Sequence, residues 1–183
     1  MDFGRVMTAM VTPFLDNGEV DYDEVKRLAV HLIENGNDSL VVCGTTAETP
    51  TLTHEEKINI VKAVKEAIGG KAAIIVGTGT NCTRTTIEAT KEMEALGVDG
   101  VLVVEPYYNK PSQEGLYQHF KAVAEATALP IILYNIPGRC GINMTPELIA
   151  RLAQIPNIVA VKEAAGSIEQ VSKIKTLVPD DFI

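Results

Sequence analysis

Cysteine is scarce in this sequence, and its three copies, Cys43, Cys82 and Cys140, are far apart. An odd number of cysteines without a Cys-x-x-Cys spacing argues against a disulfide framework and against a thiolate zinc site. The three histidines are equally scattered and have no partner at ligand spacing. We therefore expect reduced thiols in a cytoplasmic protein, and no metal site.

Long apolar runs and an excess of positive charge are also missing. No apolar run approaches the roughly 18 residues that span a bilayer, and the start, Met1–Arg5, lacks the basic and apolar regions of a signal peptide. Lys and Arg number 16 against 24 Asp and Glu, which gives a net charge of −8 and a pI of about 4.9. This balance argues against nucleic acids and membrane surfaces as partners.

The sequence is long enough for a substantial core, because 46% of its 183 residues are hydrophobic. Without linkers or low-complexity segments, residues 1–183 are expected to form a single domain. Short apolar runs, the expected strands, lie at 6–11, 39–43, 72–76, 98–104, 130–134 and 157–162. The amphipathic segments between and after them, the expected helices, lie at 21–34, 53–68, 83–96, 113–127, from 145 onward and at 168–178. Thr53 and Glu56 have the spacing of a capping box at a helix start.

The six strand-then-helix units predict an α/β fold with a parallel sheet, because the strands are apolar without alternation. The mean unit is about 30 residues, so eight units would need about 240, close to the size of a TIM (β/α)8 barrel. Two architectures remain open: a doubly wound sheet, or a TIM-type barrel truncated to about six βα units.

Residues able to do chemistry gather just after strand C-termini, where both architectures place their sites. They are Thr45 and Thr46, Tyr108, Tyr134 and Arg139, and Lys162. Lys162 is either a solvated strand end or a desolvated amine, whose lowered pKa would allow a Schiff base with a ketone. Glu163 need not pair with it, since neighbours on a strand point to opposite faces. Tyr134 is either a core tyrosine or a group that passes protons to a carbinolamine.

The other polar positions have equally ordinary alternatives. Thr45 and Thr46 follow Gly44 in a turn that either satisfies its own amides or cradles a carboxylate. Arg139 is either a surface arginine or a fork for a substrate carboxylate. Gly77-Thr78-Gly79 lacks the third glycine of a dinucleotide fingerprint, so no nucleotide site is expected.

Four segments, Gly44–Glu48, Glu105–Pro111, Tyr134–Gly141 and Val161–Ala164, resemble in order and spacing the dihydrodipicolinate synthase family of pyruvate-dependent class I aldolases. The resemblance runs from Val6 to the last residue and implies a TIM-type barrel. It implies a lyase that condenses pyruvate with L-aspartate 4-semialdehyde in lysine and diaminopimelate biosynthesis. No cofactor is implied beyond a covalent Schiff base on lysine.

The resemblance also implies a role for each candidate residue. Lys162 would form the Schiff base with pyruvate. Tyr134, Thr45 and Tyr108 would form a proton relay, with Tyr108 reaching into a neighbouring subunit's site. Thr46 would bind the pyruvate carboxylate, and Arg139 the carboxylate of the semialdehyde.

The sequence departs from the family pattern at three places. Ala47 replaces a glycine and Thr49 a serine, and Ala47 would carry about 1 kcal/mol of strain if the turn needs a positive φ. The lysine-inhibited members bind their effector through positions matching Thr49, His54, Lys57, Asn81, Thr85 and Tyr107. Lys57 and Thr85 replace a histidine and a glutamate there, so we expect little inhibition by lysine.

The third departure is that the chain stops where a seventh strand is expected. An incomplete barrel would have open edges, so we expect a homo-oligomer, at least a dimer, that covers them. Two alternatives to the synthase remain: another pyruvate or 2-oxoacid aldolase of the superfamily, or a catalytically idle truncated paralogue that acts as an assembling scaffold.

Overall fold

Six strands alternate with helices along the chain in a computed structural model that describes residues 3–183. Met1 and Asp2, which open the segment considered above for a signal peptide, lie outside the described residues. The chain divides into two compact units, and each is described separately below. The expectation that residues 1–183 form one domain stays a prediction.

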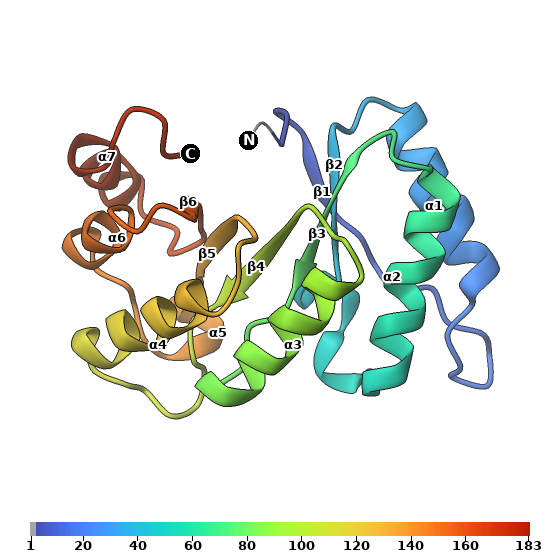
Figure 1. The fold of residues 1–183 in the computed structure, drawn as a ribbon, viewed down its shortest axis with the longest axis horizontal. Helices are drawn as coiled ribbons and strands as arrows, with labels where there is room; N and C mark the ends of the chain where they lie inside the picture. Colours follow the sequence, from blue (N-terminus) through green and yellow to red (C-terminus); the bar gives the residue numbers. More distant parts are fainter. Residues whose placement is uncertain (1–2) are drawn as a thin grey trace. The chain divides into compact units, whose positions relative to one another are not determined.

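The first unit contains the residues up to Gly77 together with Ala95–Gly100. Its elements are β1 (Met7–Ala9), α1 (Tyr22–Glu34), β2 (Ser39–Val42), the 3-10 turns η1 (Thr45–Ala47) and η2 (Thr49–Thr51), α2 (His54–Ile68) and β3 (Ala73–Gly77). The strands pair in parallel in the order β1-β2-β3. Helices α1 and α2 lie side by side against these strands (Figure 1).

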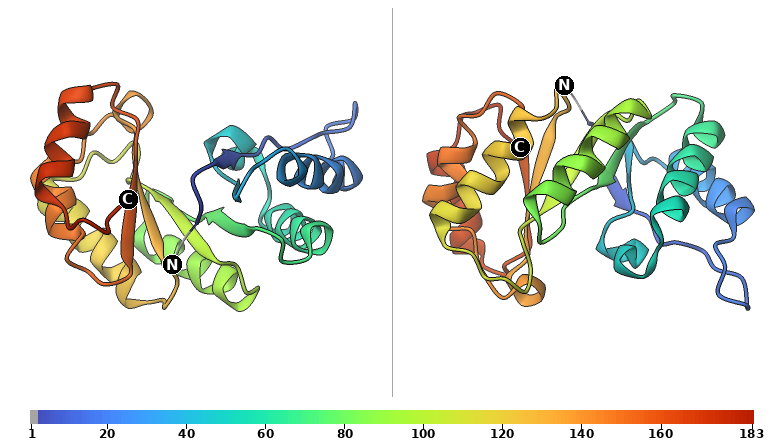
Figure 2. Two further views of the ribbon diagram at one scale, coloured as in Figure 1. Left: turned by 90° about the horizontal axis from the view of Figure 1, so that it is seen from above. Right: turned by 60° about the horizontal axis from the view of Figure 1, so that its bottom comes forward.

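The second unit contains Thr78–Glu94 and Val101–Ile183. Its elements are α3 (Thr83–Ala95), β4 (Gly100–Val104), α4 (Gln113–Glu125), β5 (Ile131–Asn135), α5 (Pro137–Cys140), α6 (Pro146–Leu152), β6 (Ile158–Glu163) and α7 (Ile168–Leu177), although the last residue of α3 and the first of β4 belong to the first unit. The strands pair in parallel in the order β4-β5-β6. Helices α4, α6 and α7 cover one side of them (Figure 2).

The helices begin where side chains satisfy their first backbone N–H groups. The Asp21 side chain accepts the N–H of Glu24 at the start of α1. Thr53 and Glu56 form the predicted capping box at the start of α2. Within residues 3–183, no helix is both long and apolar enough to cross a bilayer.

The register of β4, β5 and β6 determines which side chains share a face. Val104 lies opposite Tyr134, which lies opposite Lys162. Asn135 lies opposite Glu163, one residue further along. Because successive strand residues point to opposite faces, Tyr134 and Lys162 share one face, and Asn135 and Glu163 share the other.

Candidate functional site

Lys162 and Tyr134 are brought together at the carboxyl ends of adjacent strands. The Lys162 Nζ lies 4.4 Å from the centroid of the Tyr134 ring. Tyr134 is buried, whereas the Lys162 side chain as a whole is exposed. The amine therefore rests against the aromatic face, and the register between β5 and β6 fixes the pair.

Desolvation by the surrounding protein lowers the pKa of Lys162 below its usual value. The direction is the one that a Schiff-base lysine needs, because only the neutral amine attacks a ketone. Among residues 3–183 no carboxylate opposes the shift, and Glu163 points to the other face as expected. Its Oε2 accepts hydrogen bonds from Asn135 (2.9 Å) and Gln170 (3.0 Å), and its Oε1 accepts one from the Ala165 N–H (2.7 Å).

Thr45 and Thr46 form the beginning of η1 in the first unit, directly after β2. Two hydroxyl groups brace this turn: Thr12 donates to the Ala47 carbonyl (2.8 Å) and Thr49 to the Gly44 carbonyl (2.7 Å). The first N–H groups of such a turn have no partner inside it. The structure thus presents Thr45 half-buried and Thr46 exposed at the strand end.

Ala47 does not carry the strain that a positive φ would cause, because its φ is not positive. The left-handed values fall on Cys43 (φ 53°) and Glu48 (φ 55°), on either side of the threonines. Cys43 is a buried residue in this conformation, which is uncommon outside glycine. The turn therefore takes its shape from the residues that flank it, and alanine is tolerated at position 47.

Tyr108 follows β4 and projects from the second unit with 88% of its surface exposed. Its φ is 70°, a genuine outlier for a bulky residue. Neighbouring Asn109 anchors the loop by donating its side-chain N–H to the Asn81 carbonyl (2.7 Å). A strained, exposed tyrosine is costly unless the conformation serves a purpose.

Arg139 lies in α5, a single helical turn after β5 that the sequence analysis did not predict. The turn closes at Gly141, whose φ is 76°, and the Gly141 N–H donates to the Pro137 carbonyl (2.9 Å). The Arg139 side chain is exposed, while Cys140 beside it is buried. Buried Cys140 thus anchors the turn, which keeps the Arg139 guanidinium on the surface.

A buried polar row lies behind Tyr134 and Lys162, which the sequence pattern did not predict. Glu105 and Asn135 in it are fully buried, and Glu163 is half-buried. Asn135 donates to Glu163 and to the Asn143 side chain (2.8 Å), and its Oδ1 accepts the Met144 N–H (2.9 Å). The signal in the sequence was present but unused: each residue directly follows an apolar strand run or ends one.

Burial raises the pKa of two thiols to about 12, those of Cys43 and Cys140. The structure gives Cys82 a lowered pKa instead, first through a hydrogen bond from the Thr85 backbone. All three cysteines are free. Across residues 3–183, no cluster of three or more His, Cys, Asp or Glu side chains is arranged to hold a metal ion.

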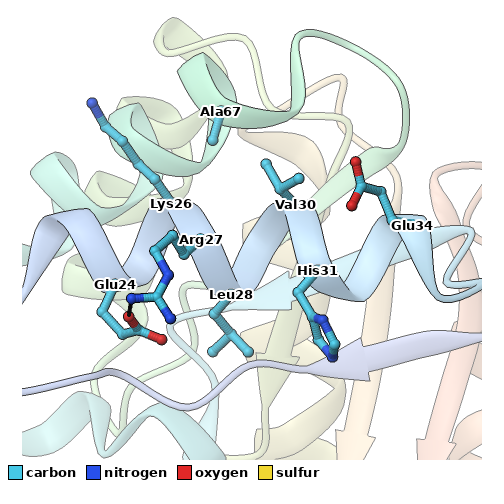
Figure 3. A pocket seen from close by; sticks show the side chains of 8 residues that line it. All are labelled: Glu24, Lys26, Arg27, Leu28, Val30, His31, Glu34 and Ala67. Atoms are coloured by element: carbon cyan, nitrogen blue, oxygen red, sulfur yellow. Dashed lines mark ion pairs between the residues drawn. The ribbon is translucent and has the colours of Figure 1, made fainter.

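A hollow of about 550 Å³ lies elsewhere, along α1 in the first unit. Figure 3 shows side chains of α1 and Ala67 of α2 around it, with Glu24 and Arg27 joined in an ion pair of 2.8 Å. None of the six candidate residues lines it. Its walls carry no buried polar group without a partner, so we assign it no role.

Parallel βα units with a lysine held against a tyrosine at the ends of adjacent strands define an α/β protein with a lysine-centred site. The family model of the dihydrodipicolinate synthetase family matches residues 2–183. The chain belongs to this family.

Named relatives agree with this membership. The chain is 59% identical to a 4-hydroxy-tetrahydrodipicolinate synthase of Desulforamulus reducens, over 100% of this chain and 62% of that protein. A solved dihydrodipicolinate synthase from Bacillus anthracis has a TM-score of 0.97 at 48% identity, over 100% of this chain and 62% of the other. The enzyme from Cyanidioschyzon merolae, solved with lysine bound, has a TM-score of 0.96 at 53% identity, over 98% of this chain and 62% of the other.

These matches confirm the fold class, six βα units of a TIM-type barrel, over the open doubly wound sheet. They also show that the chain spans about three fifths of the length of the relatives it matches.

Proposed function

We propose that this chain carries the Schiff-base lysine of a synthase that condenses pyruvate with L-aspartate 4-semialdehyde, in lysine and diaminopimelate biosynthesis. The observation that carries the proposal is the amine of Lys162 against the Tyr134 ring, with its pKa lowered by desolvation. High identity to named synthases supports the choice of reaction. We also propose that residues 1–183 act as one domain, in the cytoplasm, where their three free cysteines stay reduced.

In the proposed reaction, the neutral amine of Lys162 adds to the ketone carbon of pyruvate. Tyr134 passes a proton to the carbinolamine oxygen, which leaves as water and gives an iminium ion. Loss of a methyl proton then gives an enamine, whose carbon attacks the aldehyde of the second substrate. No cofactor takes part, because the iminium nitrogen accepts the electron pair.

The remaining roles are carried over from the resemblance. Thr45 and Tyr108 take part in the proton relay, Thr46 binds the pyruvate carboxylate and Arg139 binds the carboxylate of the semialdehyde. The exposure of Tyr108 and its strained φ support a second copy of the chain as the partner that receives it. We therefore propose a homo-oligomer, at least a dimer.

The proposal is tested by measuring pyruvate consumption that depends on L-aspartate 4-semialdehyde. Turnover with this aldehyde supports the synthase. Turnover that needs another aldehyde would point to a different 2-oxoacid aldolase of the superfamily. No turnover and no covalent pyruvate adduct would point to an idle scaffold.

Replacing Arg139 by alanine should raise the KM for the semialdehyde about 10- to 100-fold, since a hydrogen bond to a charged group contributes about 1.5–3 kcal/mol. Formation of the pyruvate adduct should not change, and Arg139 is exposed, so the fold should persist. Steady-state kinetics measures the KM, and trapping of the pyruvate adduct measures its formation. The KM of Arg139→Lys, which keeps the charge but loses the forked pair of donors, should lie between those of the unmodified protein and Arg139→Ala. An unchanged KM in Arg139→Ala would remove the assigned role.

Millimolar lysine should inhibit this protein weakly, because Thr85 brings no charge to meet the effector's amine. Its hydroxyl already donates to the Cys82 carbonyl (3.1 Å) and bonds to the Thr80 hydroxyl (2.7 Å). Thr85→Glu should increase inhibition, while the neutral Thr85→Gln should not. Dose–response curves with lysine measure all three proteins, and strong inhibition of the unmodified chain would overturn the prediction.

A further inference from the structure

Glu105 stands out among the acidic residues because none of its surface is exposed. It directly follows β4, on the face away from Tyr134 and Lys162. A carboxyl group in a dry environment costs free energy unless its contacts compensate. The hydrogen-bond partners of Glu105 therefore indicate what a buried glutamate does at this position.

Glu105 bonds to the end of β5 and to the segment after it at three points, two through its backbone and one through its carboxyl group. Its backbone N–H donates to the Tyr134 carbonyl (3.1 Å), and its Oε1 accepts the N–H of Ile136 (3.1 Å). Its carbonyl accepts the Cys140 thiol at 3.6 Å. The three partners run from Tyr134, the proposed relay residue, to Cys140, one residue beyond Arg139.

The second carboxyl oxygen has a different environment. The Oε2 of Glu105 is buried and has no hydrogen-bond partner. Burial raises the pKa of Glu105 to about 7, the nearby Glu163 carboxylate adds to the rise, and the bonds from Ile136 and Cys140 oppose it. The titratable groups that act on it are Cys140 of α5 and Glu163 of β6.

We propose that Glu105 is a positioning residue that holds Tyr134 and the Arg139 turn in their working geometry. The proposal rests on the proposed function for what that segment does, but the holding itself is a property of the fold. Glu105 touches neither substrate nor lysine, and acts through the backbone of residues 134–140. A shorter side chain would leave the part-buried Ile136 N–H without its acceptor.

Three variants of the full chain test the proposal. Glu105→Ala removes the acceptor, and Glu105→Gln keeps an oxygen for the Ile136 N–H but cannot ionise. Thr90→Ala is the matched control, because buried Thr90 bonds to the Thr78 hydroxyl (3.0 Å) and to the Thr86 carbonyl (2.7 Å), and neither partner belongs to β5 or to the segment after it. Each protein is measured by amide hydrogen exchange over residues 131–141, by kcat and KM for pyruvate, and over pH 5–9.

Glu105→Ala should lose exchange protection in residues 131–141 and lose kcat about 10- to 100-fold with little change in the KM for pyruvate, since small misplacements are costly in catalysis. Glu105→Gln should keep the exchange protection and the kcat of the unmodified protein, and should lack the ionisation of Glu105 near pH 7. Thr90→Ala should melt at a lower temperature with an unchanged kcat. If Glu105→Ala fails to fold, Glu105→Gln decides: exchange protection and kcat close to those of the unmodified protein support the proposal, and a loss of both contradicts it.

Unaltered exchange and kcat in Glu105→Ala would overturn the proposal, as would equal losses in Glu105→Ala and Thr90→Ala. So would a Glu105→Gln protein that loses as much kcat and exchange protection as Glu105→Ala, because it keeps an oxygen for the Ile136 N–H. If the unmodified protein forms no pyruvate adduct, the proposed function fails. The exchange comparison still decides whether Glu105 holds the segment.

Discussion

Replacing Lys162 by alanine should lower the condensation rate about 10⁴-fold or more, the scale on which loss of a covalent nucleophile slows other enzymes. The reason is that no other amine rests against the Tyr134 ring among the described residues. Because the Lys162 side chain is exposed, its removal should change the free energy of unfolding little. Steady-state kinetics and denaturant unfolding measure the two effects.

Lys162→Arg is the matched control for charge and size. Its guanidinium stays protonated and cannot form a Schiff base, so this variant should be as inactive as Lys162→Ala. Retention of a substantial rate in either variant would show that Lys162 is not the nucleophile.

Replacing Gly77 by alanine should destabilise the protein by about 3 kcal/mol, the upper part of the usual range for overpacking. A Cβ at Gly77 would lie 2.2 Å from the Cys43 carbonyl oxygen and 2.9 Å from its carbon. Both are backbone atoms, so the clash cannot be relieved by the rotation of a side chain. Cys43 already has a φ of 53°, so a displacement of its backbone would reach the turn that begins at Gly44. Urea unfolding measures the loss.

Gly138→Ala is the control, since its Cβ would meet nothing within 4 Å. Its φ does not lie in the left-handed region, so alanine should be neutral or slightly stabilising. A Gly77→Ala protein as stable as Gly138→Ala would mean that the approach of Gly77 to Cys43 is not a constraint.

Much of the fold could be predicted from the sequence because its signals are local. Apolar runs predicted all six strands, and the capping box of Thr53 and Glu56 predicted the start of a helix. The alternation of side chains along a strand also separated Lys162 from Glu163 correctly. The choice between a barrel and an open sheet came from the resemblance, since both have the same local pattern.

The remaining features depend on contacts between distant residues. The sequence left open whether the turn needs a positive φ at Ala47, and tertiary packing puts the positive φ values on Cys43 and Glu48 instead. The role of Glu105 depends on the register that sets it beside Tyr134 and Ile136, some thirty residues away. The one-turn helix α5 was missed because four residues are too few to show a helical period.

Borohydride trapping tests the central claim, that Lys162, with its amine partly desolvated against the Tyr134 ring, binds pyruvate covalently. The protein is incubated with pyruvate, reduced, digested and mapped by mass spectrometry over a range of pH. We expect one reduced pyruvate on Lys162, formed at a rate that rises with pH and reaches half its maximum below the usual lysine value of 10.5. No adduct, or an adduct on another lysine, would contradict the account.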